Sequence, residues 1–169
     1  GRLVATFARS RAGIDFESSI AGVRKTVDAT GPELAKLAEG FRGLSKAIPV
    51  DVNELNRLGE SAGALGIPKD RILEFAKVMA ELGVTTNLTS EQAAVGTARI
   101  QNIFGKAGQD TGRFASTLVA LGNAGASTET EILEMAQRIA GAGSVVGLSQ
   151  GQVLGFASAL SSVGINAEA

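Results

Sequence analysis

Residues 66–84 read GIPKDRILEFAKVMAELGV, and their apolar side chains recur at the spacing of a helix. The positions i, i+3, i+7 and i+10 on one helical face are filled by Ile72, Phe75, Met79 and Leu82. The Gly-Ile-Pro that opens the stretch is typical of one helix ending and another beginning. We therefore expect a helix that follows this break and ends at Gly83.

Start signals of the same kind divide the rest of the chain. A Ser, Thr or Asp three residues before Glu or Gln can form a capping box, in which each residue satisfies the other's backbone amide. Such pairs are Thr30/Glu33, Asp51/Glu54, Thr89/Gln92 and Ser149/Gln152, with further starts expected at Asp110 or Thr111 and at Ser127 or Thr128. No segment shows the alternation of apolar and polar residues that is typical of a strand. The sequence predicts an all-α fold of seven to nine short helices, with ends near Gly105, Gly122 and Gly164 and a first helix over about Asp15 to Val27.

The opening stretch recurs later in the chain. Residues 147–165, GLSQGQVLGFASALSSVGI, match residues 66–84 at an offset of 81 positions. The identical pairs include Gly66/Gly147, Phe75/Phe156, Ala76/Ala157 and Gly83/Gly164, and Leu82/Val163 are apolar in both. We expect an internal two-fold repeat over roughly 30–84 and 111–165, in which Phe75 and Phe156 are both core residues.

This repeat suggests a division of the chain. Residues 1–29 would form an N-terminal helical lead-in, residues 30–110 the first repeat unit, and residues 111–169 a truncated second unit. We also expect the chain to be part of a longer protein.

The composition argues against several classes of function. The chain has no His, Cys, Tyr or Trp, which removes the commonest general base, thiolate chemistry and most aromatic stacking platforms. Its formal net charge is −1 with both signs interspersed, so the charge pattern of a nucleic-acid-binding protein is missing. We assign no catalytic, cofactor-binding or metal-binding residue and expect no enzyme activity, no cofactor and no small-molecule substrate.

Two glycine patterns and one acidic cluster resemble binding or catalytic sites at first sight. Gly141, Gly143 and Gly147 have the spacing GxGxxxG after a helix, whereas a dinucleotide-binding loop needs GxGxxG after a strand. Gly143, Gly147, Gly151 and Gly155 recur every four residues, a spacing that allows two helices to approach closely. We interpret Gly147 as a helix stop and Gly155 as a point of close helix packing. The acidic cluster of Glu129, Glu131 and Glu134 suits the positive end of a helix dipole better than a metal or catalytic site.

Residues 139–167 carry no charged side chain. That length could span a bilayer, so a membrane-active protein that inserts the 139–165 hairpin is the alternative function. Seven Ser and Gln residues and the Ser149/Gln152 start signal favour instead two helices with a break near Gly147–Ser149, packed within the protein and covered on their outer face.

Much of the chain resembles the core region of phage tail tape-measure proteins. The resemblance runs from about Phe16 to Ala169 and rests on four motifs in order: Gly-Ile-Pro at 66–68, Thr-Ser-Glu-Gln-Ala-Ala at 89–94, Leu-Gly-Asn at 121–123 and Gly-Leu-Ser at 147–149.

The resemblance implies a structural protein of a bacteriophage or prophage tail. Such proteins lie in the lumen of the tail tube, set tail length during assembly and are made in the host cytoplasm. The resemblance also implies a homo-oligomer that contacts the tail tube, the tail tip and tail assembly chaperones, without direct sequence-specific binding of nucleic acid. A measuring stretch needs continuous helix, so we interpret this much-interrupted segment as a compact assembly module.

Overall fold

The computed structural model describes residues 2–165, with side chains from residue 13 onward, and all regular structure in that range is α-helical. The eight helices are α1 (Arg2–Thr26), α2 (Gly31–Ala47), α3 (Val52–Ala64), α4 (Ile72–Thr85), α5 (Ser90–Ile103), α6 (Thr111–Ala124), α7 (Glu129–Val145) and α8 (Gln150–Ser162). The expected fold class and helix number are confirmed for this range. The first helix begins before the expected Asp15 and ends at Thr26.

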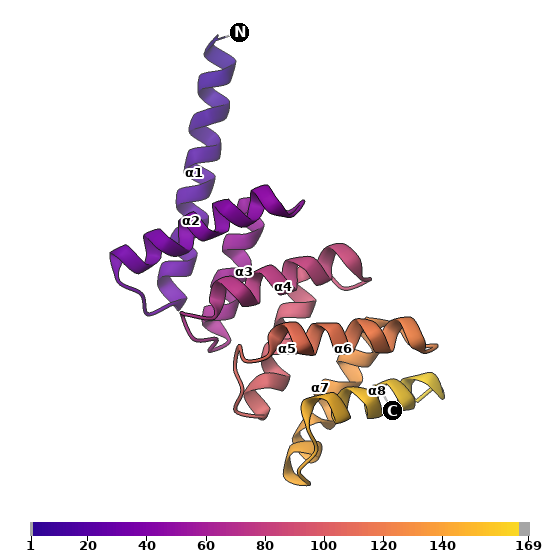
Figure 1. Ribbon diagram of the computed structural model, residues 1–169. Coiled ribbons are helices and arrows are strands. Elements are labelled where there is room, and N and C mark those ends of the chain that lie inside the picture. Colours follow the sequence, from indigo (N-terminus) through magenta and orange to yellow (C-terminus); the bar gives the residue numbers. More distant parts are fainter. Residues whose placement is uncertain (1, 166–169) are drawn as a thin grey trace.

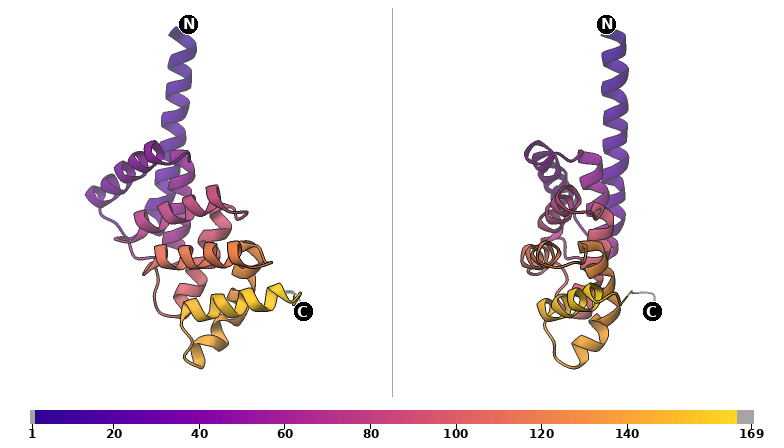
Figure 2. Two further views of the ribbon diagram at one scale, coloured as in Figure 1. Left: turned by 45° about the vertical axis from the view of Figure 1, so that its right-hand side comes forward. Right: turned by 90° about the vertical axis from the view of Figure 1, so that its right-hand side faces the viewer.

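The helices are arranged in two rows. The even-numbered helices α2, α4, α6 and α8 lie one below another in Figure 1, and the odd-numbered helices cross behind them. The two further views separate the rows, and they show the N-terminal part of α1 projecting beyond the other helices (Figure 2). Each helix packs on its neighbours in the same row, and most also pack on the next helix in the chain.

The core runs continuously between the two rows. Side chains from every helix contribute to it, and their buried apolar members include Val23, Phe41, Leu55, Ile72, Phe75, Met79, Ile100, Leu118, Ile132 and Leu154. Phe75 is fully buried, as its spacing predicted.

Most helix starts follow the sequence signals. Capping boxes form at Thr30, Thr89, Thr128 and Ser149. Asp51 also caps its helix, but it accepts a hydrogen bond from the backbone of Asn53 at 2.8 Å, and Glu54 takes no part in the cap. Glu54 accepts instead from the Ser90 hydroxyl at 3.0 Å, which joins the start of α3 to the start of α5.

One predicted helix end was wrong, because α4 continues past Gly83 to Thr85. α6 ends near Gly122 as expected, but it passes through that residue and ends at Ala124. A Cβ atom at Gly83 would lie 2.8 Å from the backbone nitrogen of Ser90, and one at Gly122 would lie 2.6 Å from the Glu129 carboxyl carbon. These glycines therefore let the first residue of the following helix approach closely, and they do not reverse the backbone.

Other glycines do end helices as expected. Gly66, Gly105, Gly147 and Gly164 have φ values of +81°, +64°, +82° and +81°, in the left-handed region that favours glycine.

After Gly66 the new helix begins later than the Gly-Ile-Pro signal indicates. Residues 68–71 form a turn in which the Arg71 amide donates to the Pro68 carbonyl at 2.8 Å, and α4 starts at Ile72.

A buried glutamine, which the sequence analysis did not single out, holds the loop between α5 and α6. The Gln101 side chain accepts from the Gly108 amide at 2.9 Å and donates to the Gln109 carbonyl at 3.0 Å. It also donates to the Thr111 hydroxyl at 3.3 Å. These bonds fix the loop just before Asp110, which has a φ of +52°.

The close approach at Gly83 can be tested against a glycine in open space. Gly83→Ala should lower the free energy of unfolding by about 1–3 kcal/mol, because the added methyl overpacks against the Ser90 backbone. Gly141→Ala in α7 is the matched control, since nothing lies within 4 Å of its Cβ position. That change should stabilise the protein by about 0.5–1 kcal/mol through helix propensity. Urea denaturation measures both, and equal responses would contradict the role given to Gly83.

Candidate interaction surfaces

The acidic residues at the start of α7 have structural roles at the beginning of that helix. The Glu131 carboxylate accepts hydrogen bonds from the backbone amide of Thr128 at 2.8 Å and from its hydroxyl at 2.9 Å, and these bonds lower the pKa of Glu131. Glu129 lies against Gly122 of α6. Within the described part of the chain, no cluster of three or more His, Cys, Asp or Glu residues could hold a metal ion.

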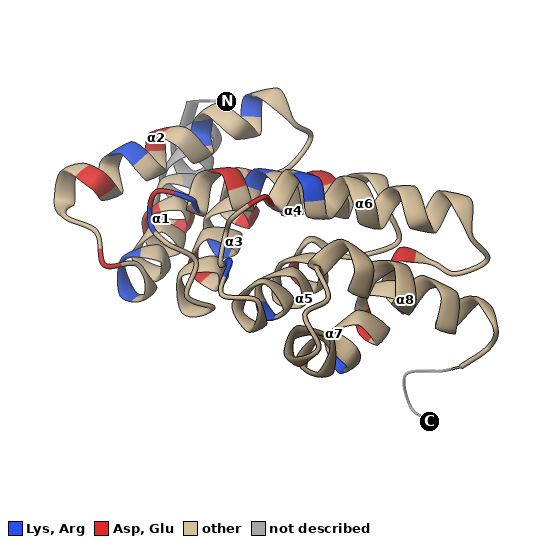
Figure 3. Cartoon of the chain, turned by 60° about the horizontal axis from the view of Figure 1, so that its bottom comes forward, with Lys and Arg blue, Asp and Glu red and all other residues tan. Residues whose placement is uncertain are grey.

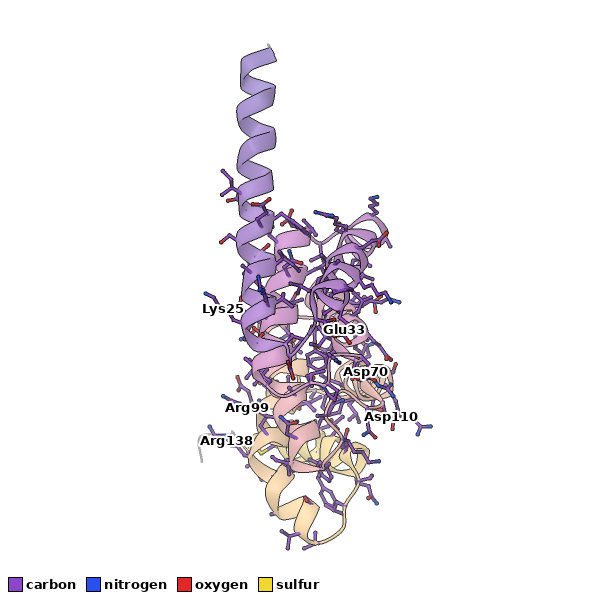
Figure 4. All side chains as sticks on the ribbon, turned by 90° about the vertical axis from the view of Figure 1, so that its left-hand side faces the viewer. Lys25, Glu33, Asp70, Arg99, Asp110 and Arg138 are labelled. Atoms are coloured by element: carbon purple, nitrogen blue, oxygen red, sulfur yellow. The ribbon has the colours of Figure 1, made fainter. Side chains whose placement is uncertain are left out.

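An open hollow lies on the odd-numbered row, between α5 and α7. Its volume is about 680 Å³, and it is lined by Arg99, Asn102, Ile103, Glu134, Gln137 and Arg138. Figure 4 shows Arg99 and Arg138 on the same side of the molecule as Lys25, with Glu33, Asp70 and Asp110 toward the other side. This hollow offers two guanidinium groups and one carboxylate at an open surface.

The outer face of the last helix pair is apolar and exposed. Phe156 is 55% exposed and Val163 is 73% exposed, and Val145 and Val146 are exposed at the α7–α8 turn. The ribbon of α8 carries no blue or red segment in Figure 3, because none of its residues is charged.

Two predictions fail on this face. Phe156 was expected in the core, but no helix in residues 2–165 lies beyond α8 to cover it. Gly155 was expected at a close packing contact, but nothing lies within 4 Å of its Cβ position. The expected break is confirmed, because α7 ends at Val145 and α8 begins at Gln150. In the described range no helix is both long enough and apolar enough to cross a membrane.

The sequence also matches a known family. The model of the phage-related minor tail protein family matches residues 38–169, from within α2 through α8. The chain belongs to this family. The resemblance seen in the sequence is thereby confirmed at the level of the family, and the functional assignment that follows is a component of a phage tail. Searches of curated proteins and of solved structures returned no match.

In this tail protein the surface that sequence reasoning misplaced is the apolar face of α8. The sequence did indicate an unusual surface here, because residues 139–167 lack charge and their outer face was expected to be covered. Apolar spacing identifies which face of a helix avoids water. It does not identify whether the covering helix belongs to the same chain.

A charged contact ties the start of α2 to the loop before α4. The Glu33 carboxylate lies 2.9 Å from the Lys69 ammonium, and it also accepts from the amide and hydroxyl of Thr30 at 2.8 and 2.9 Å. The hydrogen bond from Lys69, followed by those from Thr30, lowers the pKa of Glu33 from 4.5 to about 2.

This contact predicts a pH dependence for the tail protein. Because the folded-state pKa of Glu33 is lowered, its contribution to stability is present above about pH 4.5 and is lost as the pH falls toward 2. Lys69→Met should raise the Glu33 pKa, as measured by carboxyl NMR titration. Lys77→Met is the control, since Lys77 pairs with Glu81 and does not contact Glu33. A wild-type Glu33 that titrates near its ordinary value would refute the contact.

Proposed function

We propose that this chain is a segment of a tail tape-measure protein that acts in tail assembly and in tail-length determination inside the tail tube. The observation that carries the proposal is the family match over residues 38–169. The ordered motifs of the tape-measure resemblance support it, and the all-helical fold of the described residues is consistent with it. Its site of action would be the tube lumen, after synthesis in the host cytoplasm.

Within such a protein this segment would be an assembly module and not the measuring stretch. Continuous helix advances about 1.5 Å per residue, whereas α2 to α8 fold back on one another in helices of 13 to 17 residues. Its proposed partners are other copies of the chain, the tail tube, the tail tip and the tail assembly chaperones. Protein partners are favoured because the open surfaces are apolar or of mixed charge.

We also propose that residues 30–84 and 111–165 are two copies of one helical unit, with residues 1–29 as a lead-in. Gly66 and Gly147 share a left-handed conformation, which supports the 81-residue offset. So does the packing of α3 on α2 and α4, which parallels that of α7 on α6 and α8. An experimental structure in which the two units superpose would bear this out. Different helix polarity in 66–84 and 147–165 would refute it.

The module can be distinguished from a measuring stretch by an in-frame deletion of residues 90–162 in the parent tail gene. If the segment measures length, electron microscopy should show infective particles with tails shorter by about 110 Å. If it is an assembly module, tails should be absent or of uncontrolled length. Gly141→Ala in the same gene is the control and should leave tails normal. Normal tails in the deletion strain would refute any role in the tail.

A further inference from the structure

A pocket lies where the start of α8 meets the start of α6. Its volume is about 430 Å³, within the range of small-ligand pockets. It is bounded by the loop before α6, the first turns of α6, the α7–α8 turn and the first residues of α8. Its apolar lining comes from Phe104, Phe114, Leu148 and Leu154, so the pocket has a surface on which an apolar group can pack.

Three hydrogen-bond donors in the lining have no acceptor. Lys106 and Arg113 are exposed and form no ion pair within residues 13–165. The Nε2 amide of Gln150 is buried and has no hydrogen-bond partner in the same range. A buried donor without an acceptor costs free energy, and folded proteins pair nearly all such groups. The carboxylate in the lining belongs to Asp110, so the cations outnumber it and favour an anionic ligand.

The other two junctions of the even-numbered row are filled. Figure 4 looks onto this end of the row, where Glu33, Asp70 and Asp110 lie at successive levels. Between α2 and α4, the Lys69 ammonium lies 2.9 Å from the Glu33 carboxylate. Between α4 and α6, the 108 loop packs so closely that a Cβ atom at Gly108 would lie 2.9 Å from the Arg71 Cβ. The α6–α8 junction has neither filling.

The 81-residue offset identifies the group that the α6–α8 junction lacks. Gln150 takes the place of Lys69, and Phe114 takes the place of Glu33. The donor is therefore kept, whereas the carboxylate is replaced by a phenyl ring that cannot accept a charged hydrogen bond. Lys69 and Glu33 keep 50% and 41% of their side-chain surface exposed, although α5 and α6 follow them in the chain. Following helices thus leave this end of the row open.

We propose that the α6–α8 pocket binds a carboxylate that carries a short apolar group. The carboxylate accepts a hydrogen bond from the Gln150 amide and pairs with the Arg113 guanidinium, as Glu33 pairs with Lys69 in the first junction. The apolar group packs on Phe104 and Phe114. Such a group is supplied by the C-terminal residue of a protein chain or by one of its acidic side chains.

An NMR titration of the ¹⁵N-labelled chain tests the site directly. The probe is N-acetylleucine, which mimics a chain terminus, and the signal is the side-chain amide of Gln150. This signal should move downfield and saturate, because the amide then donates to a charged acceptor. N-acetylleucinamide is the matched neutral probe and should leave the signal in place. No shift with the acid at 50-fold excess, or an equal shift with the neutral probe, overturns the proposal.

Two further probes separate the sources of the carboxylate. The α-amide of N-acetylglutamic acid mimics an acidic side chain, and tighter binding of this probe than of N-acetylleucine would assign the site to such a side chain. The opposite order would assign it to a chain terminus. Inorganic phosphate has charge but no apolar group, so phosphate that binds as tightly as either acid would overturn the proposal.

Variants of the lining test the donors. Gln150→Leu and Arg113→Met should each raise the dissociation constant of N-acetylleucine about 10-fold, since each removes a bond to a charged group. Arg57→Met is the control, because Arg57 is exposed on α3 and does not line the pocket. Constants that stay unchanged in both lining variants overturn the proposal.

The stability of Gln150→Leu provides a second check that needs no ligand. Thermal melting followed by circular dichroism should show a midpoint no lower than that of the wild type, because the change removes a buried amide that has no partner. A clearly lower midpoint would mean that the amide is already bonded within the chain, which also overturns the proposal. The chain alone is used throughout, so these outcomes are independent of its role in the tail.

Discussion

The fold depends on the mutual burial of helices that are too short to persist alone. Isolated helices below about 12–15 residues are marginal in water, and most of α2 to α8 are of about this length. Their stability must come from covering one another's apolar faces. The two-row arrangement follows from this need, because it gives each inner helix a neighbour on either side in its own row and a second row against its back. The helices at the ends of each row lack one such neighbour within the described range, and the exposed apolar face of α8 is one result.

The parts of the structure governed by local hydrogen bonds could be predicted from the sequence. A capping box involves residues three apart, so Thr89 with Gln92 and Ser149 with Gln152 could be recognised without knowledge of the fold. The left-handed glycines at 66 and 147 were recognisable for the same reason. The helix number and the all-α class follow from these signals together.

The errors arise where a residue's role depends on a distant part of the chain. A glycine can end a helix, or it can allow a neighbouring backbone to approach closely. The local sequence around Gly83 is compatible with both roles, and only the position of Ser90 in the fold decides between them. Phe75 and Phe156 occupy equivalent positions in nearly the same local sequence, yet only Phe75 has neighbours that cover it fully. The hydrogen bonds of Gln101 to the 108–111 loop were beyond prediction too, because nothing in the surrounding sequence shows that its side chain turns inward.

The two-row packing has a consequence for how the chain gains and loses its structure. Its substantial helix contacts join helices one or two places apart in the chain, so no end of the described range depends on the other. Such a chain can fold progressively as it leaves the ribosome, because each new helix finds its neighbours already made. The reverse also holds: a pull applied at one end would separate the helices in succession, each step resisted only by the contacts of the outermost helices. Unfolding under force would then cross a series of small barriers in place of one large one.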